Sequence, residues 1–251
     1  MAPDPRLIAT GTARYEATKI PEAIKYPRGL SLSGSWSGAY GSHLTFVASE
    51  DFRQTAMVVP SPPISADKVL LRRLGRKQRR EFIESLDADT RVALEGDLAR
   101  HLAPLIERSR VIGAYCPLPD EISPLPALGA ATARGATIAF PAFAAAHLPF
   151  RFLAGDPVEP GPFFAMQPAL TSKEVFPDLV LVPLVAIDRA GTRLGQGKGH
   201  YDRVLAELKR RGALLIGLGW ATQLIDGTIE ADPWDVPLDG FASPQGVEMW
   251  R

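Results

Sequence analysis

The sequence predicts an α/β protein in which a layered, mostly parallel sheet is flanked by helices. Predicted strands alternate with predicted helices from about residue 64 to residue 251, a pattern typical of right-handed crossover connections. The most apolar segment, DLVLVPLVAID at 178–188, is a continuous hydrophobic run of the kind found at the centre of parallel sheets. A chain of 251 residues, 46% hydrophobic and 22% charged, suits one such domain with an extension.

Residues 1–63 differ in composition from the rest of the chain. The stretch YPRGLSLSGSWSGAYGSHL at 26–44 is rich in Gly and Ser and has no sustained hydrophobic period, and VVPSPPIS at 58–65 is rich in proline. We therefore predict an irregular or disordered N-terminal extension over 1–63, followed by a single α/β domain over 64–251.

Two helices are predicted at the start of the α/β domain. The first, over 65–86 with Ser65 as a possible N-cap, carries apolar residues at multiples of four: Leu70, Leu74, Phe82 and Leu86. The second, over 89–108, has one leucine-rich face. The basic run RRLGRKQRR at 72–80 is interpreted as a solvated face whose cations mostly need no partner.

The remaining elements alternate between strands and helices. The predicted strands are, in order, 110–117, 136–143, 147–153, 178–188 and 213–220. A short helix that ends at Gly135 lies between the first two strands, a proline-rich irregular segment follows over 154–176, and a helix is predicted over 200–211. In sheets of this kind ligands gather beyond the carboxyl ends of the strands, so we expect a site after residue 188.

Charge balance and cysteine content argue against several classes of protein. Lys and Arg together number 28, as do Asp and Glu, so no basic excess points to nucleic acid. The single cysteine, Cys116, excludes an intramolecular disulfide and is interpreted as a buried core thiol. Because we find neither a signal peptide nor an apolar run long enough to span a membrane, we expect a cytoplasmic protein with no membrane partner.

The segment RLGQGKGHYD at 193–202 follows the most apolar strand and predicts a phosphate site. It fits neither familiar phosphate motif: residue 200 is His where a dinucleotide fingerprint needs Gly, and residue 192 is Thr where a P-loop needs Gly. Its glycines lie at alternate positions: Gly195, Gly197 and Gly199. Their N–H groups, two cations and the start of the next helix suit a polyphosphate, and Asp202 suits a bridging Mg²⁺.

Four segments of the chain, in order, resemble the 5-formyltetrahydrofolate cyclo-ligase family. The segment DLVLVPLVAIDRAGTRLGQGKGHYDRVL is similar to the family's strand and glycine loop, and KVLLR at 68–72 is similar to its N-terminal Lys-x-x-x-Arg. The segments YCPLPDEIS at 115–123 and DPWDVPLDGFAS at 232–243 are similar to its acidic segment and its closing Asp-x-x-x-Asp stretch. The resemblance covers about residues 66–242.

The resemblance implies an ATP- and Mg²⁺-dependent enzyme that closes 5-formyltetrahydrofolate to 5,10-methenyltetrahydrofolate and releases ADP and phosphate. Its small-molecule partners would be ATP and a reduced folate, and the family expectation is a monomer. The implied fold is Rossmann-like and similar to the sugar-phosphate isomerase and CoA-transferase type. In the implied reaction the formyl oxygen takes the γ-phosphoryl group, folate N10 attacks the activated carbon, and phosphate leaves.

The resemblance also implies roles for individual residues. The implied ATP-binding residues are Lys68, Arg72, Arg193, Gly195, Gln196, Gly197, Lys198 and Gly199. The implied folate-binding residues are Glu121, Phe163, His200 and Tyr201. The implied catalytic residues are Arg193, Lys198 and Tyr201, and the implied Mg²⁺ ligands are Asp202 and Asp235.

Three positions depart from the family pattern. Residue 196 is Gln where the family often has Arg, residue 200 is His where Tyr is usual, and residue 184 is Leu where Gly is usual. These departures keep two alternatives open. In the first alternative, the chain is a diverged relative that acts on another formamide-like substrate. In the second, it is a nucleotide- or folate-binding protein without catalytic activity.

Overall fold

The computed structural model describes residues 33–37, 43–47, 68–162 and 165–250, and the chain divides into one unit over Met1–Met57 and another over Val58–Arg251. In the first unit, β1 (Ser33–Ser37) and β2 (His43–Val47) pair antiparallel, with Ser33 opposite Val47. The other residues of the predicted N-terminal extension lie outside the described ranges.

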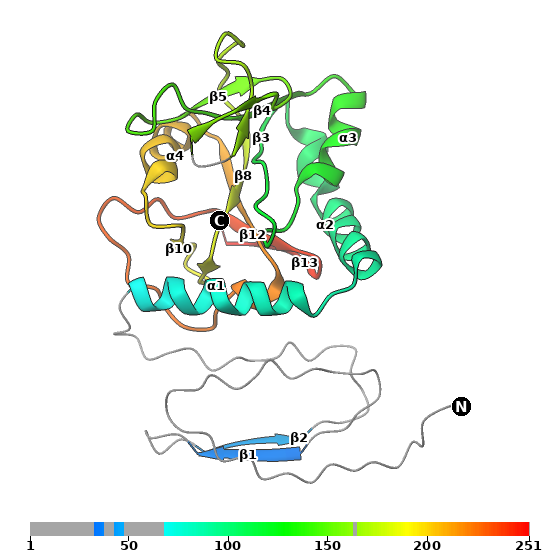
Figure 1. The fold of residues 1–251 in the computed structure, drawn as a ribbon, viewed down its shortest axis with the longest axis vertical. Coiled ribbons are helices and arrows are strands. Elements are labelled where there is room, and N and C mark those ends of the chain that lie inside the picture. The colour runs from blue at the N-terminus through cyan, green and yellow to red at the C-terminus, as the bar shows by residue number, and fades with distance from the viewer. Residues whose placement is uncertain (1–32, 38–42, 48–67, 163–164, 251) are drawn as a thin grey trace. The chain divides into compact units, whose positions relative to one another are not determined.

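A seven-stranded sheet in the order β13-β12-β11-β8-β3-β4-β5 organises the second unit (Figure 1). Its strands are β3 (Val111–Gly113), β4 (Thr137–Ala142), β5 (Arg151–Ala154), β8 (Leu179–Pro183), β11 (Leu214–Leu218), β12 (Gly240–Ser243) and β13 (Gly246–Met249). The five inner strands are parallel, and the two edge strands pair antiparallel with their neighbours. The predicted α/β fold with a mostly parallel sheet is confirmed.

The sheet is covered on both faces. The helices are α1 (Lys68–Glu84), α2 (Ala88–Arg108), α3 (Leu125–Ala133), α4 (His200–Arg210) and the short 3₁₀ helix η2 (Ala221–Gln223). In Figure 1, α4 lies on one side of the sheet, and α2 and α3 lie on the other. Alternate residues of β8 enter two separate cores: Leu179 and Leu181 pack with α2 and α3, whereas Val180 and Val182 pack with α4. Burial on both faces explains why this strand is apolar throughout.

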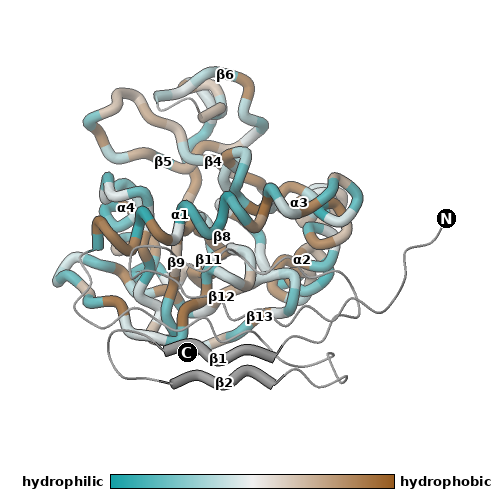
Figure 2. The backbone as a smooth tube through the Cα atoms, turned by 60° about the horizontal axis from the view of Figure 1, so that its bottom comes forward, coloured by the Kyte–Doolittle hydropathy of each residue, from teal (hydrophilic) through white to brown (hydrophobic). Residues whose placement is uncertain are grey.

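Helix α1 differs from the prediction for 65–86. It begins at Lys68, and the predicted N-cap Ser65 lies outside the described residues. The predicted apolar residues are unequally buried: Leu70 is 42% exposed, whereas the Phe82 ring packs against the core and lies 5.5 Å from that of Trp220. The most buried side chain of the helix is that of Arg79. Much of α1 is hydrophilic in Figure 2. Gly75 allows α1 to pack closely, because a Cβ there would lie 2.8 Å from Val185 Cγ1.

Several short strands were absent from the predicted elements. The strands β12 and β13 extend the sheet at one edge, and β6 (Glu159–Pro160) and β7 (Met166–Gln167) pair within the segment predicted to be irregular. A third pair, β9 (Ala186–Ile187) and β10 (Arg193–Leu194), lies between β8 and α4. No helix in the described part of the chain is long and apolar enough to cross a membrane.

Candidate functional site

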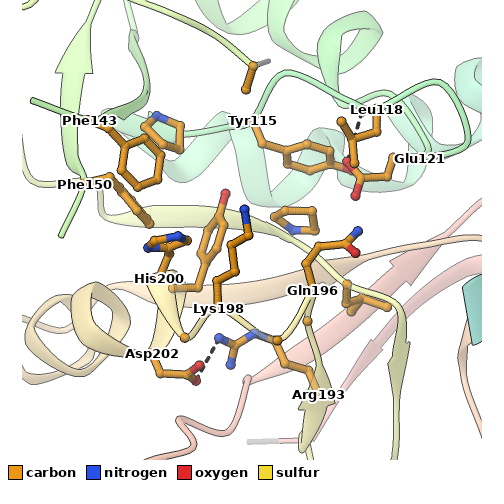
Figure 3. A pocket seen from close by; sticks show the side chains of 18 of the residues that line it. Tyr115, Leu118, Glu121, Phe143, Phe150, Arg193, Gln196, Lys198, His200 and Asp202 are labelled. Carbon is orange, nitrogen blue, oxygen red and sulfur yellow. Dashed lines mark hydrogen bonds and ion pairs between the residues drawn. The ribbon is translucent and has the colours of Figure 1, made fainter. Parts of the chain in front are cut away.

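A pocket of about 750 Å³ opens where several parallel strands end (Figure 3). Residues that follow β3, and residues at or just past the ends of β4 and β8, contribute to its wall: Tyr115, Cys116, Pro141, Phe143, Pro183 and Leu184. The segment that leads into α4 and the first turns of α1 complete the wall. The pocket therefore lies at the carboxyl ends of the strands, as the fold class predicts.

A buried carboxylate shapes the chain that enters the site. Asp188, which directly follows β9, accepts hydrogen bonds at Oδ1 from the N–H groups of Ala190 and Thr192, and at Oδ2 from the N–H of Ile229. These bonds tighten the turn between β9 and β10. The β10 strand then brings Arg193 into the pocket wall, while Leu194 packs in a hydrophobic cluster with Val185 and Ile229.

The glycine loop, residues 195–199, connects β10 to α4. Gly197 has φ +92°, and Gly199, the N-cap of α4, has φ +63°. Residues other than glycine adopt such positive φ angles only at a cost in free energy. Gly195 differs, because its φ lies outside this range and a Cβ there would meet no atom of the described chain within 4 Å. Two of the three glycines are therefore required by backbone conformation.

Two arginines beside this loop are held by hydrogen bonds, one of them in an ion pair. Arg193, only 8% exposed, donates from Nη2 to Asp202 Oδ1 at 2.8 Å and from Nη1 to the Val236 carbonyl at 3.1 Å. Arg72 donates from Nε to the Gly195 carbonyl at 3.1 Å. Arg193 thus orients Asp202, while Arg72 holds the start of the glycine loop.

Lys68, the first residue of α1, joins two carboxylates from the far end of the chain. Its Nζ donates to Asp232 Oδ2 at 2.6 Å and to Asp235 Oδ2 at 2.8 Å. Burial alone would lower the pKa of Lys68, but these two carboxylates outweigh burial and raise it. The pKa of Asp235 is lowered. Burial alone would raise it, but the hydrogen bond from Lys68 and the other partners of Asp235 outweigh burial. We call Lys68, Arg72, the glycine loop, Asp202, Asp232 and Asp235 the charged half of the pocket.

The other half of the pocket is aromatic and encloses one carboxylate. The rings of Phe150 and Tyr201 meet edge to face at 5.0 Å, and Phe143 meets His200 in the same way at 5.1 Å. Burial raises the pKa of the Tyr201 hydroxyl far above 10.0, so that it stays protonated. We call Tyr115, Glu121, Phe143, Phe150 and Tyr201 the aromatic half of the pocket.

His200 stands between the two halves with a lowered pKa. Burial is the largest cause, followed by the positive charges of Arg203 and Lys198. The imidazole is therefore neutral at neutral pH and can donate one hydrogen bond and accept another. In Figure 3, His200 and Lys198 both rise from the glycine loop and the start of α4 toward the pocket interior.

Glu121 is the buried carboxylate of the aromatic half. It is 7% exposed, and its Oε2 accepts a hydrogen bond from the Leu118 N–H at 3.1 Å. Burial raises the pKa of Glu121, although the Leu118 N–H and the positive charge of Arg79 oppose that shift. The Glu121 carboxyl is therefore harder to ionise than an exposed glutamate, and the Leu118 N–H and Arg79 favour its charged form.

The structure brings most of the predicted site residues to this one pocket. The predicted residues that line it are Lys68, Arg72, Glu121, Arg193, Gly195, Gln196, Gly197, Lys198, Gly199, His200, Tyr201, Asp202 and Asp235. Phe163, the remaining predicted residue, lies outside the described residues. Cys116, predicted to be a core thiol, is only partly buried and lines the pocket, because β3 ends at Gly113.

Sequence reasoning missed three neighbours of the predicted residues. Asp232 and Trp234 line the pocket beside Asp235, and Arg79 contacts Glu121 from behind. The interpretation of 72–80 as a solvated face is wrong at Arg79, which is 2% exposed. A signal for it was present: Lys68, Arg72, Arg76 and Arg79 recur every three or four residues, which places them along one face of a helix.

A metal site made by the protein alone is not present among the described residues. No group of three or more His, Cys, Asp or Glu side chains in those ranges is arranged to hold a metal ion. Asp202 uses Oδ1 for both of its hydrogen bonds, and Asp235 uses Oδ2 for both of its own. Within the described part of the chain, the second oxygen of each carboxylate accepts no hydrogen bond.

Comparison with known proteins identifies one family. The model of the 5-formyltetrahydrofolate cyclo-ligase family matches residues 64–244. A 5-formyltetrahydrofolate cyclo-ligase of Haemophilus influenzae is 29% identical over 173 residues, which cover 65% of this chain and 92% of the relative. The enzyme of the same name from Mycolicibacterium smegmatis is 30% identical over 191 residues, covering 71% and 94%.

Solved structures agree with these matches. The structure of Aquifex aeolicus 5,10-methenyltetrahydrofolate synthetase aligns with a TM-score of 0.62 and 27% identity, covering 73% of this chain and 93% of that one. A 5,10-methenyltetrahydrofolate synthetase from Mycoplasma pneumoniae aligns with a TM-score of 0.55 and 23% identity, covering 71% and 99%, and supports the fold alone.

Proposed function

Because the chain belongs to the 5-formyltetrahydrofolate cyclo-ligase family and so converts 5-formyltetrahydrofolate to 5,10-methenyltetrahydrofolate, we propose that this pocket is its active site. The observation that carries the proposal is the division of one pocket into a charged half and an aromatic half. ATP, a polyanion, suits the charged half, and the flat pterin ring of the folate suits the aromatic half.

ATP binds, in this proposal, through its phosphates to α1 and the glycine loop. Lys68 and Arg72 lie one turn apart at the start of α1, and Lys198 extends from the loop. Backbone N–H groups of residues 195–199 and the positive end of α4 add donors suited to phosphate oxygens. Lys68 exchanges its contacts with Asp232 and Asp235 for contacts with phosphate when the nucleotide enters.

A Mg²⁺ ion fits between this phosphate site and two carboxylates. Mg²⁺ is usually held by one or two carboxylates together with substrate phosphates. Asp202 and Asp235 each have one carboxylate oxygen that accepts no hydrogen bond within the described residues. When bound, the ion would neutralise charge on the phosphates during phosphoryl transfer. Arg193 keeps Asp202 oriented for this task through its hydrogen bond to Oδ1.

The folate lies, in this proposal, against Tyr201 and Glu121. The Glu121 carboxylate accepts hydrogen bonds from N–H groups of the pterin ring. Tyr201, held by its edge-to-face contact with Phe150, forms the wall next to the formyl group, and the neutral His200 supplies a donor and an acceptor beside it. Pro183 and Leu184, at the end of β8, line the pocket between the folate and the phosphates.

The reaction then needs positioning and charge neutralisation from the protein. The formyl oxygen attacks the γ-phosphorus, and the bond from that phosphorus to ADP breaks. N10 next attacks the activated formyl carbon and loses its proton, and the carbon–oxygen bond breaks to release phosphate. Lys198 faces the pocket from the loop and balances the charge that passes from the γ-phosphoryl group to ADP.

The conjugated product gives the direct test. The purified full chain is mixed with 5-formyltetrahydrofolate, and the near-ultraviolet absorbance of the methenyl product is followed with and without ATP and Mg²⁺. An increase that requires both ATP and Mg²⁺ supports the proposal. An increase without ATP would contradict the assignment of the charged half to ATP. An increase without Mg²⁺ would contradict the Mg²⁺ site at Asp202 and Asp235.

A further inference from the structure

Arg79 occupies an unusual position for an arginine in a basic helix. It is 2% exposed, although it belongs to a run of cations on α1, and it lies behind the pocket wall without lining the pocket itself. Burying a guanidinium costs free energy unless it is fully paired, so its partners indicate why it is there.

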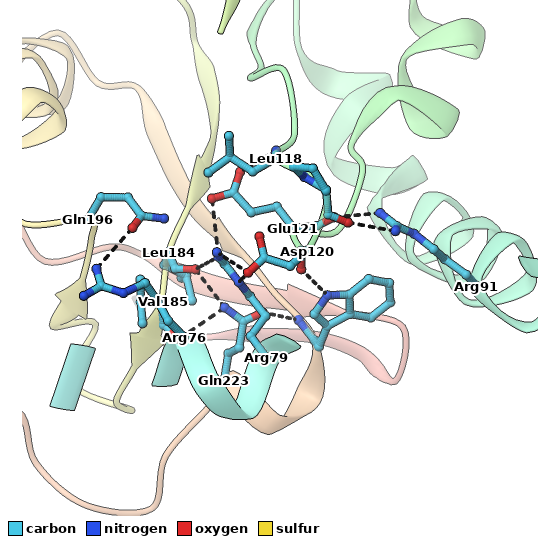
Figure 4. A network of polar contacts seen from close by, with 12 residues as sticks. Arg76, Arg79, Arg91, Leu118, Asp120, Glu121, Leu184, Val185, Gln196 and Gln223 are labelled. Atoms are coloured by element: carbon cyan, nitrogen blue, oxygen red, sulfur yellow. Dashed lines mark hydrogen bonds and ion pairs between the residues drawn. The ribbon is translucent and has the colours of Figure 1, made fainter. Parts of the chain in front are cut away.

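The partners of Arg79 come from two other segments of the chain (Figure 4). Its Nε and Nη2 approach Asp120 Oδ2, each at 3.0 Å, and its Nη1 donates to Glu121 Oε1 at 3.3 Å. The same Nη1 donates to the Leu184 carbonyl at 3.1 Å, just after β8. The rigid, planar guanidinium suits such a site, since it can reach several acceptors at fixed angles.

These contacts determine how Glu121 is presented to the pocket. Arg79 holds Oε1, while the Leu118 N–H holds Oε2. Each carboxylate oxygen has two lone-pair directions, so both oxygens keep capacity to accept a further hydrogen bond. Between them, Arg79 and Leu118 restrict rotation of the carboxylate, and both favour its charged form against the effect of burial.

The Leu184 carbonyl links this arrangement to the other half of the pocket. Gln223 of η2 also donates to that carbonyl, at 2.7 Å, so the chain just after β8 has two buried donors. This chain leads through β9 and β10 into the glycine loop. The Arg79 guanidinium therefore connects the Glu121 carboxylate to the chain that follows β8.

We propose that Arg79 is a positioning residue that holds the Glu121 carboxylate in place for the folate and ties it to the chain just after β8. The inference rests on the proposed function, which assigns Glu121 to folate binding. Arg79 itself does not touch the substrate, and its contribution to binding passes through Glu121.

A matched control exists on the neighbouring helix. Arg91 of α2 donates to the backbone carbonyls of Pro119, at 2.9 Å, and Glu121, at 3.1 Å. Arg91 therefore supports the backbone of the same turn without contacting the carboxylate. If only the turn matters, Arg91 and Arg79 variants will behave alike, whereas if the carboxylate matters, they will differ.

The experiment compares KM for 5-formyltetrahydrofolate with KM for ATP in Arg79→Met, Arg79→Lys, Arg91→Met and Glu121→Gln. We expect Arg79→Met to raise the folate KM at least about tenfold and to change the ATP KM less than about threefold. Arg79→Lys, which keeps the charge and loses the fork, should give a smaller rise. Arg91→Met should leave the folate KM within about threefold of the parent value.

The double variant Arg79→Met with Glu121→Gln supplies the decisive comparison. If Arg79 acts through Glu121, the double variant will have about the same folate KM as Glu121→Gln alone. The inference is overturned if the two substitutions multiply their effects on the folate KM, or if Arg79→Met raises the folate KM and the ATP KM equally. It is also overturned if Arg91→Met raises the folate KM as much as Arg79→Met does. Should Arg79→Met fail to fold, Arg79→Lys decides, and an unchanged folate KM in it contradicts the inference.

The same measurements separate this inference from the proposed function. A folate KM unaffected by Glu121→Gln would remove Glu121 from the folate site, whatever Arg79 does. A raised folate KM in Glu121→Gln, together with a normal folate KM in the Arg79 variants, would contradict the positioning role of Arg79 and leave Glu121 in the folate site.

Discussion

The two halves of the pocket are built in different ways. In the charged half, Lys68, Asp202 and Asp235 keep nearly a fifth of their side-chain surface exposed, and Asp232 keeps 42%. In the aromatic half, Tyr115 is 3% exposed and Phe150 2%. The charged half consists of ion pairs that an anionic ligand can rearrange, whereas the aromatic half is continuous with the hydrophobic core.

This difference has a consequence for mutation. Partly exposed ion pairs contribute little to folding, so changes in the charged half should impair the reaction and leave stability nearly intact. Side chains of the aromatic half also pack the core, so changes there should reduce stability and folate binding together.

The largest expected effect is on stability, in the aromatic half. Phe150 contacts Phe152 and Tyr201 edge to face, at 5.3 and 5.0 Å. We expect Phe150→Ala to lower the free energy of unfolding by about 3–5 kcal/mol, because it removes a buried ring and leaves a cavity. Urea unfolding followed by fluorescence measures this. A loss below about 1 kcal/mol would mean that the aromatic half is not part of the core.

The next effect is on catalysis, in the charged half. We expect Lys198→Ala and Asp202→Ala each to reduce turnover at least about tenfold, roughly 1.4 kcal/mol in the barrier, through lost charge neutralisation and orientation. Initial rates at saturating ATP and folate measure it. Arg210→Ala is the control, since Arg210 is an exposed α4 residue paired with Glu207 and lies outside the pocket lining. Normal turnover in both pocket variants would contradict the catalytic assignment of this loop.

Lys68 tests whether affinity can be lost without stability. We expect Lys68→Met to raise the KM for ATP at least about fivefold, ~1 kcal/mol, because a phosphate contact is removed. The free energy of unfolding should change by less than about 1 kcal/mol. Lys77→Met, on the same helix with its own partner Glu81, is the matched control and should leave the KM for ATP unchanged. If Lys68→Met lowers the free energy of unfolding and leaves the KM for ATP unchanged, the charged half contributes to folding, and the proposed difference between the two halves is contradicted.

The smallest effect concerns pH. Burial raises the pKa of Glu121 above its ordinary 4.5, whereas the pKa of Asp235 lies below its ordinary 3.8 because its hydrogen bonds outweigh burial. As pH falls from neutral, Glu121 therefore takes up its proton first. We expect kcat/KM for the folate at saturating ATP to fall about twofold at the pH that equals the pKa of Glu121.

Glu121→Gln is the control for this pH dependence. Its side chain cannot titrate in this range, so the acid limb that belongs to residue 121 should disappear from the profile. An unchanged limb in this variant would assign the titration to another group or to the substrates.

Local patterns were sufficient for most of the fold and for the position of the site. The continuous apolar run at 178–188 predicts a central strand because both faces of β8 are buried, and the start of α4 at His200 agrees with the predicted helix at 200–211. Short strands were harder to predict. The two-residue strands β9 and β10 are defined by pairing with each other, and two residues show no period in the sequence.

Partners of charged side chains were the least predictable feature. The sequence predicts Lys68 and Asp235 as separate ligands of ATP and Mg²⁺, whereas the two side chains form an ion pair between residues 167 positions apart. The sequence predicts Arg79 to be one of several solvated cations, because its partners Asp120 and Glu121 lie 41 and 42 positions away.

The sequence by itself determined the α/β class, the glycine loop and the residues with charges suited to a polyphosphate, because backbone preference and hydrophobic period are local properties. Only the tertiary structure decided which charges meet, which are buried and which support others. The pairing of Arg79 with Glu121 and of Lys68 with Asp235 depends on how α1 packs against the ends of distant strands. Long-range pairing of this kind arises when the core closes and has no counterpart in any short segment of the chain.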